Sequence, residues 1–487
     1  MLFLAFAAGA GLVMLPAHAA ANKKVLSPLR HLKLRNLGPA IAGGRVTSVR
    51  GIPGQPLVYY VGSAAGGVWK TTNGGYSWKN VFAHGDSASI GAITLAPSNP
   101  NLVWVGTGES NPRDDMINGG GVYYSPDAGA TWVFKGLRNA GQISRIVVDP
   151  ANPNIVFVCA LDNVWKPTPT RGVYRTSNGG KSWQRVLFLN DETGCSTLAM
   201  QPGNPQVMIA GMWQVRRYPW KLVSGGPSSG LYRSVDGGLT WTKLTQGLPK
   251  APTGRSDVAF APSRPDRVYA VIQAKGGVLW ASNDMGTHWH LVSNNQNADV
   301  RPFYFTQVAV SPKNPEQIFL LSMKLMESKN GGKTMFYADK MAHVDHHAIW
   351  IDPHNGNRII QGNDGGVYIT HDDGKTWRYL DNLPIEEFYQ VAVNDHVTPF
   401  LVCGGIQDNN AWCGPSSDYS RAGVNGLDWY IPVGGDGEYV VPAPTDPNVI
   451  YASSENGYTV RYNARTTLAP FILPYYHSQA GHLVSKL

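Results

Sequence analysis

The chain has 487 residues, of which 55 are glycine, 34 are proline and 15 are tryptophan, and only 15% are charged. No segment has convincing helical periodicity or low complexity, so this composition favours many short strands joined by tight turns. The net charge of +8 permits acidic partners such as an anionic glycan or a membrane surface, but it is scattered without a Lys/Arg run, which argues against nucleic acid.

The N-terminus has the pattern of a secretory signal. Residues 2–15 are apolar, and Ala17-His18-Ala19 offers a cleavage site, so we expect a signal peptide over residues 1–19. A membrane anchor is the alternative, although the apolar run is short for a span. No other segment is apolar enough to cross a bilayer, so we expect an exported, periplasmic or extracellular chain whose mature form has no integral membrane segment.

One turn recurs along the chain as S/T-x-D/N-x-G-x-S/T-W, called here the Asp box. Its copies, the fifth and sixth of them looser than the others, end at Trp78, Trp132, Trp183, Trp241, Trp289, Met335 and Trp377. Most copies follow a Pro-x-x-Pro turn and an apolar run, as in APSNPNLVWVG. The spacing between copies is close to the length of one propeller blade, which is roughly 40–50 residues.

Residues 90–135 illustrate the repeat. We expect strands in IGAITLAP, LVWVGTG, GVYYS and TWVFKG, joined in turn by the Pro-x-x-Pro turn, a longer loop and the Asp box. Four strands per repeat predict an all-β propeller, because solenoid repeats are usually shorter and contain fewer strands. The box residues have a structural interpretation: Asp or Asn accepts turn N–H groups, Gly adopts a positive φ and Trp packs between sheets.

The boxes also divide the chain. Residues 30–385 are expected to hold seven Asp-box blades, residues 386–465 two further blades without boxes, and residues 466–487 an irregular tail that suggests truncation. Either a seven-bladed ring is followed by the start of a second propeller, or one ring has about nine to ten blades.

Cys403 and Cys413 are the more favoured disulfide pair, whereas Cys159 and Cys195 are predicted either to pair or to remain free thiols.

Several stretches resemble exported bacterial BNR-repeat proteins labelled glycosyl hydrolase or sortilin-like, among them GPAIAGGRVTSV, GSAAGGVWKTTNGG, GNDGGVYIT and GGIQDNNAWCGP. More broadly, the boxes resemble those of sialidases, xyloglucan-degrading hydrolases, the sortilin ectodomain and photosystem II assembly factors. The resemblance to xyloglucan hydrolases implies two catalytic aspartates, but Ala64 stands at the first position and Asn363 at the second, with Asp364 one residue along. The arginine triad and Tyr–Glu pair of sialidases are not located.

Strand alternation predicts which face carries function. The Pro-x-x-Pro turns and Asp boxes must share one face, so the loops between second and third strands and the links between blades share the other, where we expect a ligand. Glycoside hydrolysis needs two carboxylates, and the candidates are Asp114, Asp364, Asp408 and Asp436. Each of them is individually better explained as an aspartate that stabilises its loop.

Aromatic and polar side chains on this face suit a polysaccharide, although such aromatics also pack on their own blades. The predicted ligand-binding residues are Glu109, Arg113, Trp165, Trp213, Arg216, Tyr218, Trp220, Arg301, Tyr304, His346, Asn363, Gln407, Asn409 and Trp412. We therefore expect a glycan-binding propeller that resembles a glycoside hydrolase. The alternative is a non-enzymatic propeller that binds a protein or peptide.

A metal site is a weaker hypothesis. His343, Asp345 and His347 form the densest group of potential ligands, but alternation sends His346 and His347 to opposite faces of a strand, and the spacing matches no zinc motif. A hydrogen-bonded polar rim is the favoured interpretation. No cofactor is expected, while the loops GNDGG and IQDNN leave a structural calcium or other divalent ion open, although no twelve-residue calcium loop is present.

Overall fold

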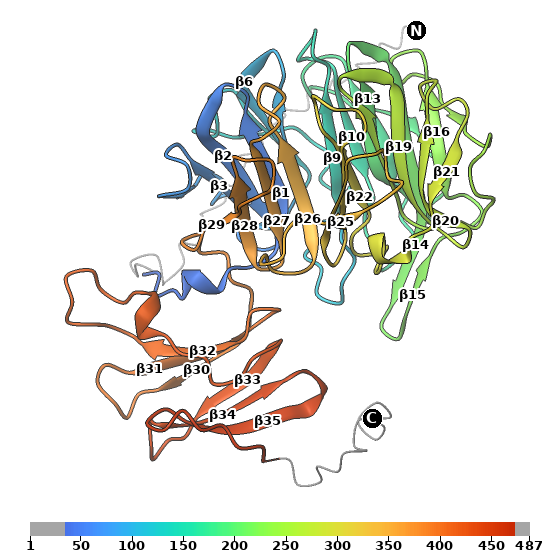
Figure 1. The fold of residues 1–487 in the computed structure, drawn as a ribbon. Helices are drawn as coiled ribbons and strands as arrows, with labels where there is room; N and C mark the ends of the chain where they lie inside the picture. The colour runs from blue at the N-terminus through green and yellow to red at the C-terminus, as the bar shows by residue number, and fades with distance from the viewer. Residues whose placement is uncertain (1–34, 473–487) are drawn as a thin grey trace, which may run out of the picture. The chain divides into compact units, whose positions relative to one another are not determined.

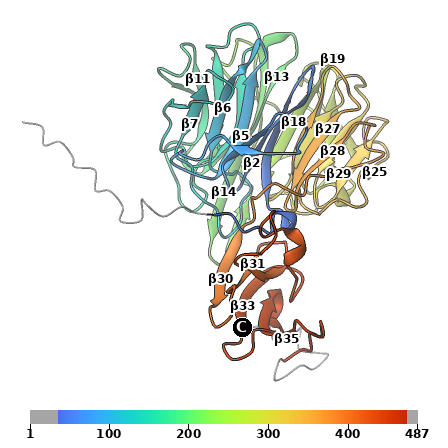
Figure 2. The same cartoon turned by 90° about the vertical axis from the view of Figure 1, so that its left-hand side faces the viewer.

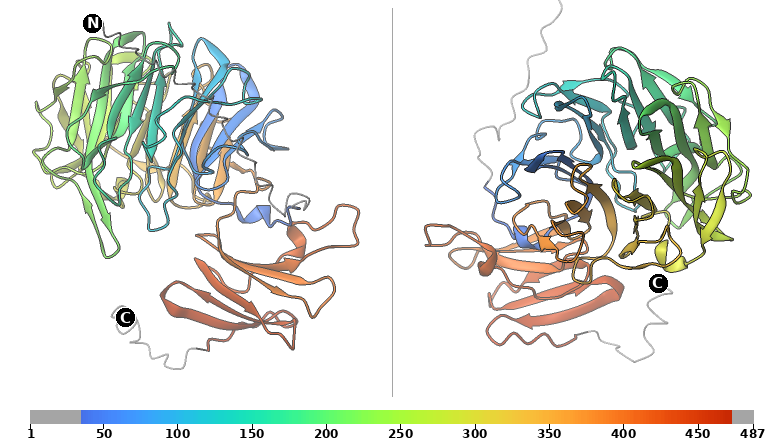
Figure 3. Two further views of the ribbon diagram at one scale, coloured as in Figure 1. Left: turned by 180° about the vertical axis from the view of Figure 1, so that it is seen from behind. Right: turned by 45° about the horizontal axis from the view of Figure 1, so that its top comes forward.

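The computed structural model describes residues 35–472, so the predicted signal peptide and most of the predicted tail lie outside the described residues. These residues form an all-β propeller in which seven sheets stand around a central axis (Figure 1; Figure 3, right). Each of the seven sheets is built from one continuous stretch of chain and is called a blade here, numbered one to seven in chain order. Within residues 35–472, no helix is long and apolar enough to cross a membrane.

The strands follow the predicted four-strand repeat. Blades one to four contain β1 (Val46–Ile52), β2 (Gln55–Ser63), β3 (Val68–Thr71) and β4 (Lys79–Asn80); β5 (Ile90–Ala96), β6 (Asn99–Thr107), β7 (Val122–Ser125) and β8 (Val133–Phe134); β9 (Ile143–Val148), β10 (Val156–Ala160), β11 (Gly172–Thr176) and β12 (Gln184–Leu187); β13 (Thr193–Gln201), β14 (Asn204–Tyr218), β15 (Lys221–Ser224), β16 (Gly230–Ser234) and β17 (Thr242–Lys243). In blade four, β15 pairs only with β14 and extends it as a hairpin.

Blades five to seven contain β18 (Ser256–Ala261), β19 (Arg264–Ala274), β20 (Gly277–Ser282) and β21 (His290–Ser293); β22 (Gln307–Val310), β23 (Ile318–Leu321), β24 (Leu325–Ser328) and β25 (Phe336–Tyr337); β26 (His346–Ile351), β27 (Ile359–Asn363), β28 (Gly366–Thr370) and β29 (Arg378–Tyr379). Two three-stranded sheets follow, with β30 (Phe388–Asn394), β31 (Leu401–Ile406) and β32 (Ala411–Pro415), then β33 (Gly437–Pro442), β34 (Val449–Ser454) and β35 (Tyr458–Asn463). Short 3-10 turns are η2 (Ala40–Ala42), η3 (Gln296–Ala298), η4 (Gly426–Asp428) and η5 (Glu455–Gly457).

The seven blades close into a ring without the last two sheets. The first strands of successive blades contact one another in the order β1, β5, β9, β13, β18, β22 and β26, and β26 then contacts β1. The two three-stranded sheets instead contact each other through β31 and β33, and both are seen in Figure 2. Of the two predicted arrangements, the structure therefore has the seven-bladed ring.

The seam between blades seven and one closes by side-chain packing, because neither sheet borrows a strand from the other. Val46 and Val61 of blade one pack with Ile360 and Val367 of blade seven in a single apolar cluster. Arg358 spans the same seam: its Nη2 donates to the carbonyl of Ile52 at 2.8 Å, and its guanidinium also binds Asp352 at 2.8 Å. The apolar cluster and the buried Arg358 thus contribute to ring closure together with more exposed bonds, such as that from the Trp78 indole to Asn382.

The Asp boxes have the structural role expected from the sequence. Asp236 Oδ1 accepts the N–H groups of Leu239 and Thr240 at 3.0 Å, and the Trp132 indole donates to the carbonyl of Val81 in the preceding blade at 2.6 Å. The favoured disulfide Cys403–Cys413 is formed across β31 and β32. Cys159 and Cys195, for which pairing and free thiols were both open, pair between blades three and four. No free cysteine occurs in the described part of the chain.

The boxes predict a measurable acid sensitivity. The Thr240 hydroxyl and then its backbone N–H lower the pKa of Asp236 to about 2, and bonds from Thr131 and Thr376 do the same for Asp127 and Asp372. A lowered folded-state pKa gives stability that is present above the unfolded value of about 3.9 and is lost as the pH falls towards 2.

Changing all three aspartates to Asn should leave stability at pH 7 nearly unchanged, because Asn178 already accepts the same N–H groups in its own box. The variant should lose less stability than the wild type between pH 4 and pH 2, as measured by thermal unfolding at each pH. Equal losses in both proteins would contradict this account.

Candidate functional site

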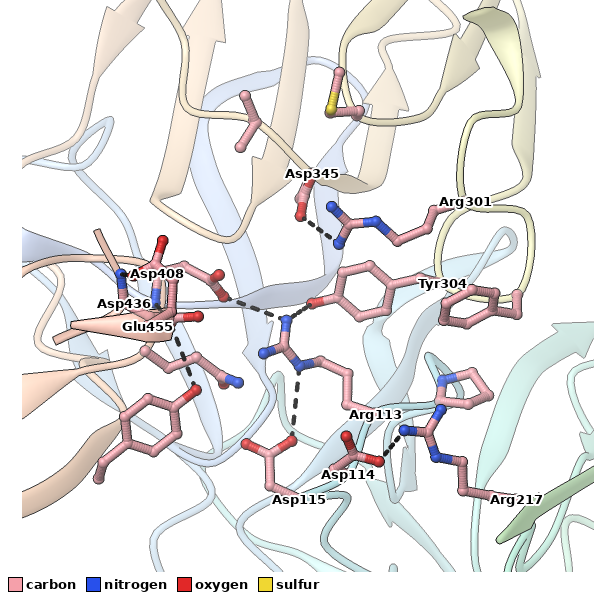
Figure 4. Close-up of a pocket in the computed structure, with 16 residues that line it drawn as sticks. Arg113, Asp114, Asp115, Arg217, Arg301, Tyr304, Asp345, Asp408, Asp436 and Glu455 are labelled. Carbon is pink, nitrogen blue, oxygen red and sulfur yellow. Dashed lines mark hydrogen bonds and ion pairs between the residues drawn. The ribbon is translucent and has the colours of Figure 1, made fainter. Parts of the chain in front are cut away.

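A pocket of about 580 Å³ lies among loops of the face that the strand alternation predicts (Figure 4). It is lined by Pro112, Arg113, Asp114, Asp115, Arg217, Arg301, Phe303, Tyr304, Met323, Val344, Asp345, Tyr389, Gln407, Asp408, Asp436 and Glu455. The lining residues of the seven-bladed ring come from loops between second and third strands and from links between blades. The last five lining residues come from the three-stranded sheets and their loops, and they are Tyr389, Gln407, Asp408, Asp436 and Glu455. No Asp-box residue lines this pocket, so the boxes and the pocket lie apart as predicted.

Arg113 occupies the centre of the pocket in Figure 4. Its Nε lies 3.7 Å from Asp115 Oδ1, and its Nη1 lies 3.5 Å from Asp408 Oδ2 and donates to the Tyr304 hydroxyl at 3.2 Å. The β6–β7 loop supplies Arg113 and Asp115, whereas Asp408 belongs to the loop between β31 and β32. A single guanidinium therefore holds carboxylates from two separate parts of the chain at the pocket wall.

Arg45 forms a second, fully buried centre beneath the pocket. It binds Glu109 Oε2 at 3.1 Å, Glu387 Oε2 at 3.2 Å and Gln407 Oε1 at 3.0 Å. Its Nη1 also donates to the Tyr304 hydroxyl at 3.1 Å. Although Arg45 opposes it, burial raises the pKa of Glu109 to about 7.

Asp364 lies on the inner side of Tyr304 and is itself fully buried. Its Oδ2 accepts the Tyr304 hydroxyl at 2.6 Å, and its Oδ1 lies 2.8 Å from His347 Nε2. Burial would favour the neutral carboxyl, but His347 and Arg45 outweigh it and hold the pKa of Asp364 below its usual range. Asp364 therefore supplies a buried negative charge, and its side chain has no exposed surface with which to reach a ligand.

Asp408 is the pocket carboxyl with the most unusual protonation. Burial raises the pKa of Asp408 to about 8, the charge of Asp364 adds to this rise, and Arg113 opposes it. The Asp408 side chain is still 21% exposed. At neutral pH this group is consequently a carboxylic acid that can donate a proton into the pocket, in contrast to the ionised Asp364 nearby.

The backbone at the pocket is held in unfavourable conformations. Asp345 and Asp408, which line the pocket, have φ values of 66° and 57°, and Thr306, two residues after the lining residue Tyr304, has a φ of 57°. All three lie in the left-handed region that favours glycine. The cost is greatest for the β-branched Thr306, whose hydroxyl donates to Asp299 Oδ1 at 2.6 Å. Such conformations persist where the surroundings impose them, and they cluster at functional sites.

The pocket is acidic although the chain is basic. Six carboxylate residues and three arginines line it, against a net charge of +8 for the whole chain. Arg301 pairs with Asp345 at 3.4 Å, and Arg217 pairs with Asp114. Asp436 Oδ1 accepts the N–H of Asp408 at 2.6 Å, and Glu455 Oε2 accepts the N–H of Asp436 at 2.9 Å. A polyanionic ligand would be repelled here, so neutral ligands suit this pocket better.

Several predicted ligand-binding residues are buried and structural instead. Trp213 packs among Met116, Leu161 and Val164, and Trp165 packs against the same cluster. The Trp412 indole donates to the carbonyl of Asn409 at 2.7 Å. Eight of the predicted ligand-binding residues have little or no exposed surface. Of these, Tyr304 and Gln407 still line the pocket. The other six do not line it, and they are Glu109, Trp213, His346, Asn363, Asn409 and Trp412. The structure buries these six side chains within the fold instead of exposing them at the pocket. Sequence position on a loop face does not reveal which side chains turn inward.

The His343–His347 segment does not gather its side chains around one point. His343 contacts the carbonyls of Val344 and Asp408, and Asp345 pairs with Arg301. His346 lies 3.7 Å from Asp339 on the other side of its strand, opposite to His347, as alternation predicts. Among residues 35–472, no group of three or more His, Cys, Asp or Glu side chains is arranged to hold a metal. Neither ring nitrogen of the buried His346 forms a hydrogen bond to any described residue.

The two carboxylate positions implied by the resemblance to xyloglucan hydrolases are structural in this chain. Ala64 is buried, and its N–H donates to the carbonyl of Arg45 at 3.0 Å. Asn363 is also buried, where its amide donates to the carbonyl of His343 at 3.1 Å and accepts the N–H of Gly365 at 3.0 Å. Any carboxylate chemistry must therefore come from other residues of the pocket.

Sequence reasoning did not single out Arg45, Glu387, Tyr389 or Glu455. Arg45 follows two glycines in GPAIAGGRVTSV, a stretch that was noticed for its resemblance but not for its arginine. The signal that could have found it is its position immediately before the first strand, on the functional face. The other three belong to the unboxed sheets, whose orientation towards the ring is not encoded in any local pattern.

The comparisons with known proteins agree with the fold. No protein-family model matches the chain. A xyloglucanase from a Paenibacillus species is 24% identical over 340 residues, which is 62% of this chain and 32% of that relative. The photosystem II assembly lipoprotein Ycf48 of a Picosynechococcus species is 23% identical over 309 residues, 53% of this chain and 84% of that protein.

Among solved structures, the GH74 xyloglucanase from Xanthomonas campestris superposes with a TM-score of 0.57 at 16% identity, covering 88% of this chain and 74% of that one. The chain thus spans about a third of the length of the Paenibacillus xyloglucanase that it matches. These similarities support a β-propeller of the kind found in GH74 xyloglucanases, which is the fold that the Asp boxes predict.

Proposed function

We propose that this chain is an exported propeller that binds a neutral polysaccharide and acts on it as a glycoside hydrolase at the pocket around Arg113. The observation that carries the proposal is Asp408, a partly exposed carboxyl that lies 3.5 Å from Arg113 in the pocket and whose pKa burial raises to about 8. A carboxylic acid that stays protonated at neutral pH is the proton donor that glycoside hydrolysis requires.

The second carboxylate in this proposal is Asp115. Asp115 lies beside Nε of Arg113, whereas Asp408 lies beside Nη1 of the same guanidinium. The Asp115 side chain is 35% exposed. Asp115 would act on the substrate as base or nucleophile while Asp408 protonates the leaving oxygen. Arg113 contacts both carboxylates and donates in turn to the Tyr304 hydroxyl, and Tyr389 gives the same pocket an aromatic wall.

The substrate class follows from charge and from similarity. The excess of carboxylates in the pocket disfavours pectate-like or sulfated glycans, and the similar curated proteins include several named xyloglucanases. Export is supported by the two disulfides, which persist in oxidising compartments.

The test is a panel of soluble polysaccharides incubated with the purified protein. Neutral glucans, with xyloglucan among them, are compared with polygalacturonate and heparin, and both binding and the release of reducing ends are measured. We expect binding and release with at least one neutral glycan and neither with the polyanions. Tighter binding of the polyanions would contradict the proposal, and binding without release would limit it to a lectin-like role. Failure with every glycan would favour the alternative of a peptide-binding propeller.

A further inference from the structure

The hairpin of β14 and β15 is a feature that the blade does not need. β14 pairs with β13 and β16 only as far as Gln214, and beyond this point it continues to Tyr218 and pairs with β15 alone. The hairpin extends past the neighbouring strands in Figures 1 and 3. Its tip is the dipeptide Pro219-Trp220, between the paired residues Tyr218 and Lys221.

The base of this hairpin is firmly attached beside the pocket. The N–H of Arg217 donates to the carbonyl of Val164 at 2.8 Å, and the carbonyl of Val215 accepts from Arg171 Nη1 at 3.2 Å. Arg217 also pairs with Asp114, and both residues line the pocket. Because a strand rises about 3.3 Å per residue, the tip lies roughly 10 Å along the chain from the pocket wall.

The tip presents an aromatic surface without an evident structural role. Trp220 is 76% exposed, and its ring lies 5.7 Å from that of Tyr218 at an angle of 30°. The guanidinium of Arg216 and the ammonium of Lys221 lie over the Tyr218 ring at 5.1 and 5.3 Å and restrict its motion. Proline and the ladder to β15 fix the backbone, so Trp220 is a pre-organised, solvent-facing ring where a tight turn would ordinarily carry Gly, Asn or Asp.

We propose that Trp220, with Tyr218 beside it, is a stacking platform for a sugar ring of a glycan chain that extends from the pocket. The exposed Trp220 ring offers the flat apolar surface that the apolar face of a sugar ring can cover, and the Tyr218 ring lies beside it with Arg216 and Lys221 over its own face. The proposal rests on the proposed function, since the chain that reaches the tip is the one held at Arg113. It adds that the site is longer than the pocket and favours polymers over short oligosaccharides.

The test compares Trp220→Ala with Tyr76→Ala, because Tyr76 is 77% exposed but belongs to an Asp-box turn on the opposite face. Affinities for a soluble neutral polysaccharide and for a short oligosaccharide of the same glycan are measured by calorimetry. For Trp220→Ala we expect the ratio of polymer to oligosaccharide affinity to fall about three- to tenfold, the value of one aromatic contact. Trp220→Phe should recover part of the loss, and Tyr76→Ala should keep the wild-type ratio.

The outcomes separate this inference from the proposed function. If the wild type binds both ligands and Trp220→Ala keeps the wild-type ratio, the platform is refuted while the pocket function stands. An equal fall in Tyr76→Ala would also refute the platform, because the effect would then be unspecific. If the wild type binds no glycan of either length, the proposed function fails and this inference fails with it.

Discussion

Replacing Asp408 by asparagine is expected to slow glycan hydrolysis by about 10²- to 10⁴-fold, the usual contribution of a general acid. Asparagine keeps the shape of the side chain but has no proton of suitable acidity to give to the leaving oxygen. The backbone N–H of Asp408, which donates to Asp436, is unaffected by the change. The measurement is the rate of reducing-end release on the neutral glycan that the panel identifies.

The same residue predicts the pH dependence of the wild type. A pKa of about 8 keeps Asp408 protonated below that pH, so activity should persist at neutral pH and decline as the pH rises through 8. Asp408→Asn should lose this alkaline decline together with most of its rate. An activated substrate whose leaving group needs no proton should restore part of the rate in the variant, which a merely structural role for Asp408 would not allow.

Two further variants complete the comparison. Asp115→Asn should be as damaging as Asp408→Asn if Asp115 is the second carboxylate, and the activated substrate should not rescue it. Asp418→Asn removes an exposed carboxylate outside the pocket, whose bond goes to the N–H of Ser420, and should keep the wild-type rate. A wild-type rate in Asp408→Asn would remove this residue from any catalytic role.

The fold was predictable from the sequence because its determinants are local. An Asp box needs only eight residues to specify its turn, and the alternation of strands then assigns every loop to one of two faces. That reasoning correctly placed Arg113, Asp408 and Asp436 on the face that carries the pocket. It depended on no long-range contact.

The inner arrangement of the site was beyond such reasoning because it depends on contacts between distant segments. Asp364 and Asp408 looked equivalent as loop aspartates, yet the first is buried against His347 and the second is partly exposed. Arg45 reaches residues as far along the chain as Gln407. Burial and pairing of this kind decide which carboxyl is ionised, and neither is encoded in a motif.

The ring seam provides the largest expected effect on stability. Arg358→Ala should lower the free energy of unfolding by about 3–5 kcal/mol, because it leaves Asp352 buried without its partner. Arg358 and Asp352 are only 2% and 3% exposed. The change also removes the bonds to the carbonyls of Ile52 and Gln55, which join blade seven to blade one. The loss is measured by chemical denaturation.

Arg267→Ala is the matched control for this seam. Arg267 packs over Tyr269 at 4.6 Å and faces Glu316 of the next blade at 3.9 Å, much as Arg358 packs over Tyr59 at 5.5 Å. Its acidic partner is 40% exposed, so its loss should cost only about 1 kcal/mol. Blades five and six are joined directly by the chain, whereas blades seven and one are far apart in sequence. Arg358→Ala should therefore speed amide exchange in β1 and β26 selectively. Equal costs of the two variants would contradict the buried-pair account, and unselective exchange would show that the seam is no weaker than other blade boundaries.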